Sequence, residues 1–307
     1  MQEVGQYVSE WVSLRSSGLA ARTVESYQSL IVHHIAPAFA GLPADELQPV
    51  QLQRLLASLC GRGLSRTAQM CYILIRAAYR DDCRSGVLAS DPSDRVLRPR
   101  HVAAAPRFWS PEEIRAFVVV CPSMRWGHAW LLALFCGLRR GELAGLRWSD
   151  VDLPGKVLQI CNQRQRLEGV GVVDLPPKSR AGRREIPLPS LLCDTLAAEY
   201  RRQRAQQALG AVLPAYVVSG VDNRPIDPHR LNLALSDDIA SAHLRPINLH
   251  GLRHSMATAA VSAGVSIKIL QSLLGHAHYS TTADIYAHVL RNEQISAIEA
   301  LERAVCT

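Results

Sequence analysis

Lysine is the scarcest charged residue in this chain of 307 residues. Only three of the 34 basic side chains are lysines (Lys156, Lys178 and Lys268), and the others are arginines. An arginine cannot act as a proton donor near neutral pH, whereas a lysine can. A lysine that lies in a chemically suggestive segment is therefore a candidate for proton transfer.

Cysteine pairs, leader segments and long apolar runs are also missing. The eight cysteines are scattered without a CxxC pair, which indicates buried thiols in a reducing compartment. The first residues, MQEVGQYVSEW, carry acids and no apolar core, so they do not form a secretory signal. The longest apolar stretch, residues 126–136, is too short to span a bilayer. These features predict a cytoplasmic protein with no membrane partner.

The charge balance leaves two interpretations open. A formal net charge of +7 and a pI of about 9.1 are typical of proteins that bind nucleic acid. A surplus of arginine also keeps a protein soluble, so charge alone does not decide between the two. Hydrophobic residues make up 48% of the chain, which suits a helix-rich interior.

Helical spacing of apolar residues dominates the first hundred residues. Helices are predicted over residues 4–14, from Thr23 to just before Pro37, over residues 48–59 and after the break at Ser65. The segment RVLRPRHVAAAPRFW then lacks a period and is rich in Arg, Pro and Ala, which is typical of an extended basic linker. We therefore expect a helical domain over residues 1–100 and a linker over residues 101–109.

A second domain is predicted over residues 110–307. It begins with the string SPEE, which has the composition of a helix start. Short alternating segments predict strands at residues 156–163, 170–175 and 184–188. The remaining pattern is helical. The predicted fold class is mainly α, with a small antiparallel β-sheet in the second domain.

Two arginines lie in segments that position them locally. In CGLRRGEL, Arg139 follows the glycine break at Gly137, so its side chain lies at a turn between helices. In LHGLRHS, His250 and Arg253 are three residues apart and share a helix face. His254 could form a metal pair with His250, but no third ligand accompanies them. A histidine and an arginine on one face suit a phosphate better than a metal.

Two further segments carry a tyrosine and a lysine. LLGHAHYSTTADIYAHV contains His276 and, about three helical turns later, Tyr286. Alone, a tyrosine in an apolar helix is normally a core residue. His276 and His278 lack the cysteines or carboxylates that would complete a metal site. In PPKSRAGRREIPL, Lys178 lies in a predicted turn before a strand that begins near Arg184.

Taken in this order, these segments resemble the active site of the tyrosine recombinase (phage integrase) family. The strings GLRRGEL, LHGLRHSMAT and LLGHAHYSTT…IYAHV match its three motifs, and the first hundred residues are similar to its core-binding domain. The resemblance implies an integrase-like architecture, with a helical core-binding domain followed by a mixed α+β catalytic domain. It also implies a site-specific recombinase that cleaves and rejoins DNA through a 3′-phosphotyrosine intermediate.

The chemistry of phosphodiester exchange accounts for these residue types. Tyr286 is the expected nucleophile, and a hydroxyl with a pKa of about 10 needs help to lose its proton. Arg139 and Arg253 offer paired, charge-assisted hydrogen bonds to the phosphate oxygens. Lys178 is expected to protonate the leaving 5′-oxygen. No metal or nucleotide cofactor is needed, because the covalent link conserves the energy for rejoining.

Two histidines and a glutamate complete the expected site. His250 takes part in proton transfer with the tyrosine, His276 donates a hydrogen bond to the phosphate, and Glu142 orients neighbouring side chains. The stretch from His276 to Tyr286 is one residue longer than in many family members, which leaves Tyr279 as an alternative nucleophile. Tyr279 lies nearer to His276 and lacks the Ala-His-Val context that follows Tyr286.

DNA and further copies of the chain are the expected partners. The resemblance implies double-stranded core sites with inverted repeats, bound by a homotetramer that holds two duplexes through its C-terminal tail helix. The apolar face of this helix, between Ile295 and Val305, could instead pack on its own domain. No additional domain is evident before the core-binding domain, so we expect core sites alone to suffice. The candidate DNA contacts are Arg66, Arg76, Arg80, Arg180 and Arg183.

Three other functions share parts of this pattern. A type IB topoisomerase would share every catalytic residue and act as a monomer, but the tail helix and the first domain disfavour it. A non-catalytic DNA-binding regulator would not need Lys178 or Tyr286. A metal-dependent phosphodiesterase would require a carboxylate cluster beside the histidines. The pattern does not distinguish integration from excision, resolution or inversion.

Overall fold

The computed structural model describes residues 2–102, 107–177, 179–212, 215–220 and 223–275. The chain forms two compact units, Met1–Ala104 and Ala105–Thr307. Each unit has its own hydrophobic core, as independent domains do. In the described part of the chain, no helix has the length and apolar character needed to cross a membrane.

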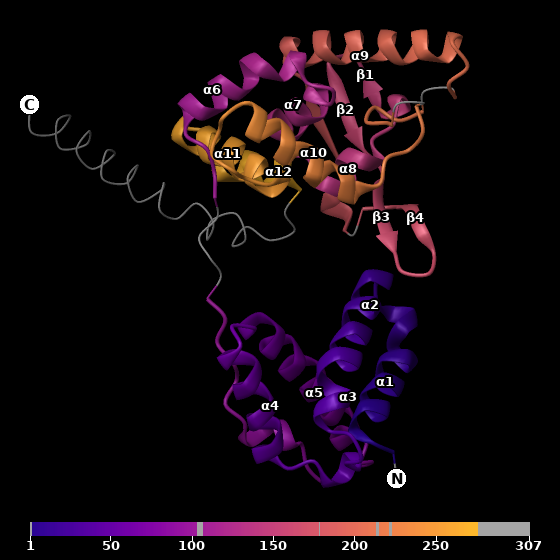
Figure 1. Ribbon diagram of the computed structural model, residues 1–307, viewed down its shortest axis with the longest axis vertical. Helices are drawn as coiled ribbons and strands as arrows, with labels where there is room; N and C mark the ends of the chain where they lie inside the picture. Colours follow the sequence, from indigo (N-terminus) through magenta and orange to yellow (C-terminus); the bar gives the residue numbers. More distant parts are fainter. Residues whose placement is uncertain (1, 103–106, 178, 213–214, 221–222, 276–307) are drawn as a thin grey trace, which may run out of the picture. The chain divides into compact units, whose positions relative to one another are not determined.

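The first unit consists of helices and turns (Figure 1). Its α-helices are α1 (Val4–Arg15), α2 (Ala21–Leu30), α3 (Ala36–Ala38), α4 (Pro49–Gly61) and α5 (Ser65–Arg84). The long helix α5 contacts α1, α2 and α4. Its fully buried side chains include Leu74, Ile75 and Ala78, which recur at helical spacing and form one stripe toward the core.

Two predicted helix limits in this unit are wrong. Helix α2 begins at Ala21, two residues before the predicted start at Thr23. The helix also does not end before Pro37, because a π-helical turn (Ile31–Ile35) leads directly into α3. Pro37 is thus the second residue of α3, within a helical run that continues from the π-helical turn.

The second unit combines helices with short strands. Its helices are α6 (Pro111–Val120), α7 (Gly127–Phe135), α8 (Arg140–Gly145), α9 (Ser190–Ala208), α10 (Pro228–Ser241), α11 (Leu249–Ser262) and α12 (Ile267–Leu274). The predicted helix start at residue 110 is confirmed. There, Ser110 and Glu113 form a capping box that satisfies two backbone N–H groups. Helix α7 is buried over nearly its whole length and contacts α9 and α11.

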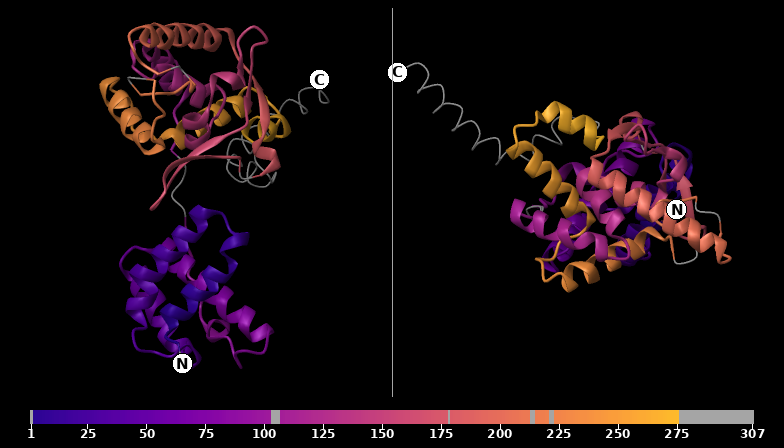
Figure 2. Two further views of the ribbon diagram at one scale, coloured as in Figure 1. Left: turned by 90° about the vertical axis from the view of Figure 1, so that its right-hand side faces the viewer. Right: turned by 90° about the horizontal axis from the view of Figure 1, so that it is seen from above.

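The strands form two small antiparallel sheets. Strands β1 (Val151–Asp152), β2 (Val157–Ile160) and β5 (Arg184–Pro187) form one sheet in the order β1-β2-β5. Strands β3 (Gln163–Leu167) and β4 (Gly171–Leu175) form a hairpin that extends from the body of the unit (Figures 1 and 2). The predicted fold class, mainly α with a small antiparallel β component in the second unit, is confirmed.

The predicted strand over residues 156–163 is wrong in its length. Strand β2 ends at Ile160, and a separate strand, β3, begins at Gln163. The sequence of β3, QRQRL, has no apolar alternation. Arg164 nevertheless occupies a buried position there, and its charge is neutralised by Asp174 on the paired strand.

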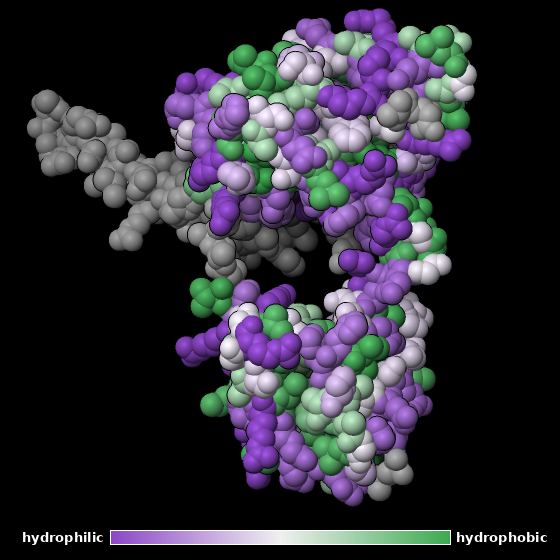
Figure 3. All heavy atoms as spheres, viewed as in Figure 1, coloured by the Kyte–Doolittle hydropathy of each residue, from purple (hydrophilic) through white to green (hydrophobic). Residues whose placement is uncertain are grey.

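Exposed apolar side chains are interspersed with polar ones on the face of the molecule shown in Figure 3. Single exposed apolar residues of this kind are normal for a folded domain. On that face, the described residues of neither unit gather into one continuous apolar patch.

The start of α7 is a sensitive test of the core. A Cβ atom on Gly127 would lie 1.7 Å from the carbonyl oxygen of Cys121, which belongs to the backbone and cannot move aside cheaply. We predict that Gly127→Ala lowers the free energy of unfolding by about 3 kcal/mol. The control is Gly61→Ala at the last residue of α4, where no atom lies within 4 Å. It should change the free energy by at most about 1 kcal/mol. Equal stability of the two variants in urea titrations would contradict this packing.

Candidate active site

Three arginines from different elements converge on the carboxyl end of α12. Its final carbonyl oxygens each accept one hydrogen bond: Leu273 from Nε of Arg184 at 2.6 Å, Leu274 from Nη2 of Arg253 at 2.5 Å, and Gly275 from Nη2 of Arg139 at 3.0 Å. The last carbonyls of a helix lack N–H partners and form its negative pole. The arginines therefore satisfy these acceptors and neutralise the helix end together.

Gly275 allows this convergence by ending α12 in the left-handed conformation, with a φ of 63°. A Cβ atom here would lie 2.8 Å from the carbonyl oxygen of Ala181 and 3.0 Å from Nη1 of Arg184. The backbone before β5 thus approaches the end of α12 closely. The next residue in the chain is His276.

Arg139 and Glu142 form the beginning of α8. The backbone N–H of Arg139 donates to Oε2 of Glu142 at 2.9 Å, and Nη1 of Arg139 donates to Oε1 at 2.7 Å. The carboxylate also accepts two bonds from Arg184, at 3.1 and 2.9 Å. The Glu142 side chain is 4% exposed, so a buried carboxylate lies between two guanidinium groups.

Burial alone would raise the pKa of Glu142. Its hydrogen bond and charge interaction with Arg184, together with Arg139, nevertheless hold the pKa below its usual value. Glu142 is therefore ionised at neutral pH and can orient both arginines at once.

Arg253 lies in the middle of α11 and is almost fully buried. Its Nη1 donates to the carbonyl oxygen of Gly137, two residues after the end of α7. Gly137 has a φ of 59°, and a Cβ atom there would lie 2.7 Å from Cε of Met256 and 2.8 Å from Cδ2 of Leu274. A glycine is thus needed where this carbonyl turns toward the arginine.

His250 lies one turn before Arg253 on α11 and is exposed at the surface. Its ring packs edge-on against the ring of His254, with centroids 4.5 Å apart. Partial desolvation, Arg253 and Arg139 lower the pKa of His250 below 6.5. Burial, followed by His250 and Arg253, lowers the pKa of His254 to about 4. Both imidazoles are therefore neutral at pH 7.

The alternative of a metal site at these histidines has no support in the described residues. Among them, no group of three or more His, Cys, Asp or Glu side chains is placed to hold a metal ion. The two histidines instead contact each other, and desolvation, together with the charge of Arg253, lowers the pKa of both.

Other predicted residues lie outside the described part of the chain. These are Lys178, His276, Tyr279 and Tyr286, together with the tail helix. Beside Lys178, Arg180–Gly182 forms a single helical turn before β5, and Arg183 is exposed. The predicted strand start near Arg184 is confirmed.

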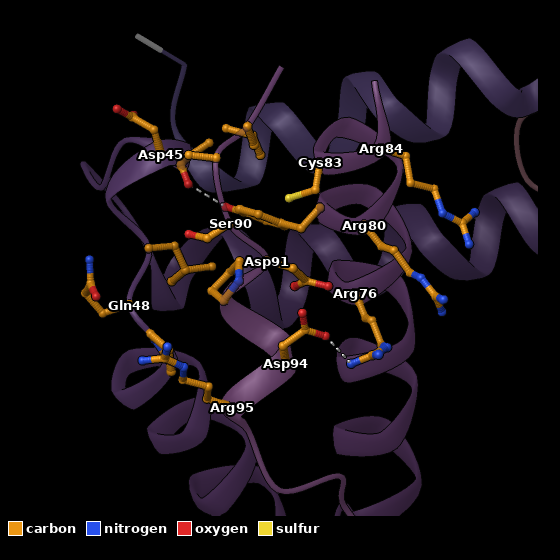
Figure 4. A pocket seen from close by; sticks show the side chains of 17 residues that line it. Asp45, Gln48, Arg76, Arg80, Cys83, Arg84, Ser90, Asp91, Asp94 and Arg95 are labelled. Atoms are coloured by element: carbon orange, nitrogen blue, oxygen red, sulfur yellow. Dashed lines mark hydrogen bonds and ion pairs between the residues drawn. The ribbon is translucent and has the colours of Figure 1, made fainter. Parts of the chain in front are cut away.

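The candidate DNA contacts of the first unit differ in their surroundings. Arg66 is exposed and donates to Gln69 at 2.5 Å. Arg76 pairs with Asp94 at 3.3 Å and donates to the hydroxyl of Tyr72, so it also has a structural role. Arg80 is exposed and lies one turn from Arg76 along α5, beside a pocket whose lining contains both arginines and aspartates (Figure 4).

A further support of the site was not predicted from the sequence. Gly141 and Gly145 of α8 lie against β3, and a Cβ atom on either would be 3.0 Å from backbone atoms of Arg164. The buried Arg164 side chain donates to both oxygens of Asp174, at 2.8 and 3.0 Å, and its guanidinium stacks 4.1 Å from the ring centroid of Tyr216. Strand β3 thus packs directly against α8.

Arg184 is the other residue that the sequence analysis missed as part of the site. Its sequence context showed only a basic turn followed by a strand. The contacts of Arg184 with Glu142 and with α12 join residues 42 and 89 positions apart, so no local pattern reveals them.

The sequence profile of the phage integrase family matches residues 107–293, which are more than half of the chain. The chain therefore belongs to the phage integrase family, the tyrosine recombinases. The predicted family and enzyme class are thereby confirmed.

Individual relatives match more of the chain than the profile does. A tyrosine recombinase XerC-like protein of Caldanaerobacter subterraneus subsp. tengcongensis is 27% identical over 285 residues, which cover 85% of this chain and 72% of that protein. The tyrosine recombinase XerC of Xylella fastidiosa is 28% identical, with 89% and 87% of the two chains covered.

Solved structures share the fold. The Tn1549 transposon integrase in complex with transposon right end DNA matches with a TM-score of 0.84 and 19% identity, and the match covers 100% of both chains. A lambda integrase tetramer bound to a Holliday junction matches with a TM-score of 0.69 and 16% identity, over 92% of this chain and 77% of that one. The predicted integrase-like architecture is thereby confirmed at the level of the fold.

The buried carboxylate makes a prediction about acid stability. Because the pKa of Glu142 is lower in the folded protein, its contribution to stability is complete above the unfolded pKa of about 4.5 and is lost as pH falls through the folded pKa. We predict that Glu142→Gln removes this part of the acid dependence and costs about 3 kcal/mol at pH 7, since it leaves Arg184 buried without a counterion. Denaturation curves between pH 3 and pH 7 test both effects.

The matched control is Asp237→Asn, at an acidic residue of α10 whose side chain is exposed. Its unfolding curve should follow that of the wild type over the whole pH range. If Glu142→Gln behaves like this control, Glu142 does not hold the site together.

Proposed function

We propose that the chain cleaves and rejoins double-stranded DNA at short core sites, with Tyr286 as the nucleophile and a 3′-phosphotyrosine as the intermediate. The observation that supports this most strongly is the convergence of Arg139 and Arg253 on the end of α12. Two guanidinium groups from separate elements meet directly before His276, in a member of the phage integrase family. A pre-arranged pair of this kind suits the spread charge of a phosphoryl transition state.

The proposed step conserves one phosphodiester bond. The oxygen of Tyr286 attacks the scissile phosphorus, a P–O bond to tyrosine forms, and the bond from phosphorus to the 5′-oxygen breaks. Arg139 and Arg253, with His276, bind the non-bridging oxygens. Lys178 gives a proton to the leaving 5′-oxygen, and reversal of the step with a new 5′-hydroxyl rejoins the strand.

His250 is the proposed acceptor of the tyrosine proton. Its pKa is lowered by partial desolvation and by the charges of Arg253 and Arg139, so the neutral, accepting form prevails at physiological pH. A histidine with a raised pKa would be charged in part of this range and could not take up a proton. The electrostatics of α11 thus favour the role of base over that of acid.

We further infer that the protein works as a homotetramer on two duplexes with inverted-repeat core sites, in the cytoplasm. The lambda integrase tetramer on a Holliday junction has the same fold, which supports this assembly. The tail helix would join neighbouring subunits, and the DNA contacts would include Arg66, Arg76, Arg80, Arg180 and Arg183. Because such arginines act on phosphates, binding should weaken steeply with salt.

Covalent trapping tests the nucleophile. A core site selected by this protein from a pool of random duplexes is nicked, so that the short 5′ strand diffuses away after cleavage. We predict that the wild type forms an adduct that survives denaturant and that Tyr286→Phe forms none, because the substitution removes only the attacking oxygen. Denaturing gels with labelled DNA measure the adduct.

Each other outcome has a defined meaning. An adduct that persists in Tyr286→Phe and disappears in Tyr279→Phe would assign the nucleophile to Tyr279. Tight binding of the selected site without any adduct would contradict the proposal and indicate a non-catalytic regulator. Relaxation of supercoiled DNA by isolated monomers would indicate a topoisomerase.

The role of His250 predicts the pH dependence of cleavage. The rate should fall on the acid side as the base becomes protonated, and the midpoint should lie below the ordinary histidine pKa of 6.5. We predict that His250→Gln lowers the rate by about 100-fold and removes this acid limb. Single-turnover rates between pH 5 and pH 8 on the nicked site measure it. If the acid limb of the pH–rate profile remains in His250→Gln, another group causes it, and His250 is not the base.

A further inference from the structure

All three guanidinium nitrogens of Arg184 donate hydrogen bonds within the protein. Its side chain is only 5% exposed, and it lies at the first residue of β5. Nε donates to the carbonyl oxygen of Leu273, Nη1 donates to the carbonyl oxygen of Gly182 at 3.1 Å, and Nη1 and Nη2 hold the two oxygens of Glu142. A buried charge with this many fixed partners is held in one orientation.

The arrangement places Arg184 behind Arg139, with Glu142 between them. Both arginines donate to Oε1 of Glu142, Arg139 at 2.7 Å and Arg184 at 3.1 Å. Arg139 is the less buried of the two, with a side chain that is 39% exposed. A side chain at that exposure has freedom to reorient unless its partner is fixed. Two bonds from Arg184, together with the backbone N–H of Arg139, fix the carboxylate.

The geometry points to Arg184 as a positioning residue for strand cleavage: it locks the Glu142 carboxylate, and through it orients the guanidinium of Arg139 toward the phosphate. This inference rests on the proposed function, because it assumes that Arg139 binds the scissile phosphate. Arg184 itself does not touch the DNA. Its effect is on the rate of the chemical step and not on the affinity for the core site.

Lysine cannot take over this role. Arg184→Lys keeps the positive charge beside Glu142, so the buried carboxylate retains a counterion. A single ammonium group cannot make the paired bonds to Glu142 and reach Leu273 at the same time. The carboxylate would then be free to shift, and a misplacement of about 1 Å at a catalytic group costs up to about 100-fold in rate.

The test is a double-substitution cycle on the nicked core site. We expect Arg184→Lys to slow adduct formation about 10- to 100-fold at saturating protein, with an unchanged dissociation constant for the same DNA. In an Arg139→Lys background, the further change Arg184→Lys should alter the already reduced rate by no more than about twofold, because no guanidinium remains to be oriented. A general structural defect would multiply in both backgrounds.

The control is Arg115→Lys on α6, where the arginine is 71% exposed and pairs with Glu112. It should leave rate and affinity as in the wild type. If Arg184→Lys does not fold, as judged by its unfolding curve, Arg184→Gln is carried through the same cycle, since Glu142 keeps Arg139 as its counterion there.

The outcomes separate the two proposals. A wild type that forms an adduct, with additive effects of the two substitutions or no effect of Arg184→Lys, overturns the role of Arg184 and leaves the proposed function standing. A larger dissociation constant for Arg184→Lys, with an unchanged rate of adduct formation at saturating protein, also overturns it. A wild type that forms no adduct on a tightly bound site overturns both.

Discussion

The buried carboxylate of Glu142 is the charge on which the arrangement of the candidate site depends. Without it, the guanidinium groups of Arg139 and Arg184 would face each other as like charges in a part of the protein with little water. With it, one carboxylate accepts three side-chain bonds and one backbone bond. The cost of burying this charge is offset only because every one of these partners is in place. The loss of any partner therefore affects the others.

The end of α12 has a complementary role. A helix carries partial negative charge at its carboxyl end, and this charge is fixed in direction by the backbone. This helix end accepts hydrogen bonds from three arginines that lie far apart in the sequence, at the start of α8, in α11 and in β5. Donors that are already ordered need no rearrangement when charge develops on a bound phosphate. The same helix end directly precedes His276 in the sequence.

Local sequence patterns predicted those parts of the fold that local interactions decide. The helix start at Ser110 follows from a capping box, and the strand start near Arg184 follows from a turn and an apolar alternation. Strand β3 was missed because one of its two buried side chains is Arg164, whose burial depends on Asp174 in the partner strand. The helical path through Pro37 was missed because a π-helical turn precedes the proline, and the spacing of apolar residues does not reveal such a turn.

The residues of the candidate site likewise divide into those that the sequence predicts and those that only the folded chain reveals. The sequence pointed to Arg139 and Arg253 because their motifs resemble those of a family, and the chain belongs to that family. It did not point to Arg184, because only the folded chain brings this residue to Glu142. Family motifs record residue types at fixed spacing, whereas a positioning contact between distant segments is visible only in three dimensions.

Helix α8 is short, with six residues, and an isolated helix of that length is not stable in water. It keeps its place because two contacts fix it. The Glu142 carboxylate binds Arg184, and Gly141 and Gly145 allow the helix to pack closely on β3. Strand β3 is itself held by Asp174, whose pKa burial alone would raise but which Arg164, Tyr216 and Arg147 hold below its usual value. The position of Arg139 thus depends on two carboxylates, the buried Glu142 and the partly buried Asp174. Acid conditions that protonate them weaken both supports of α8 at once.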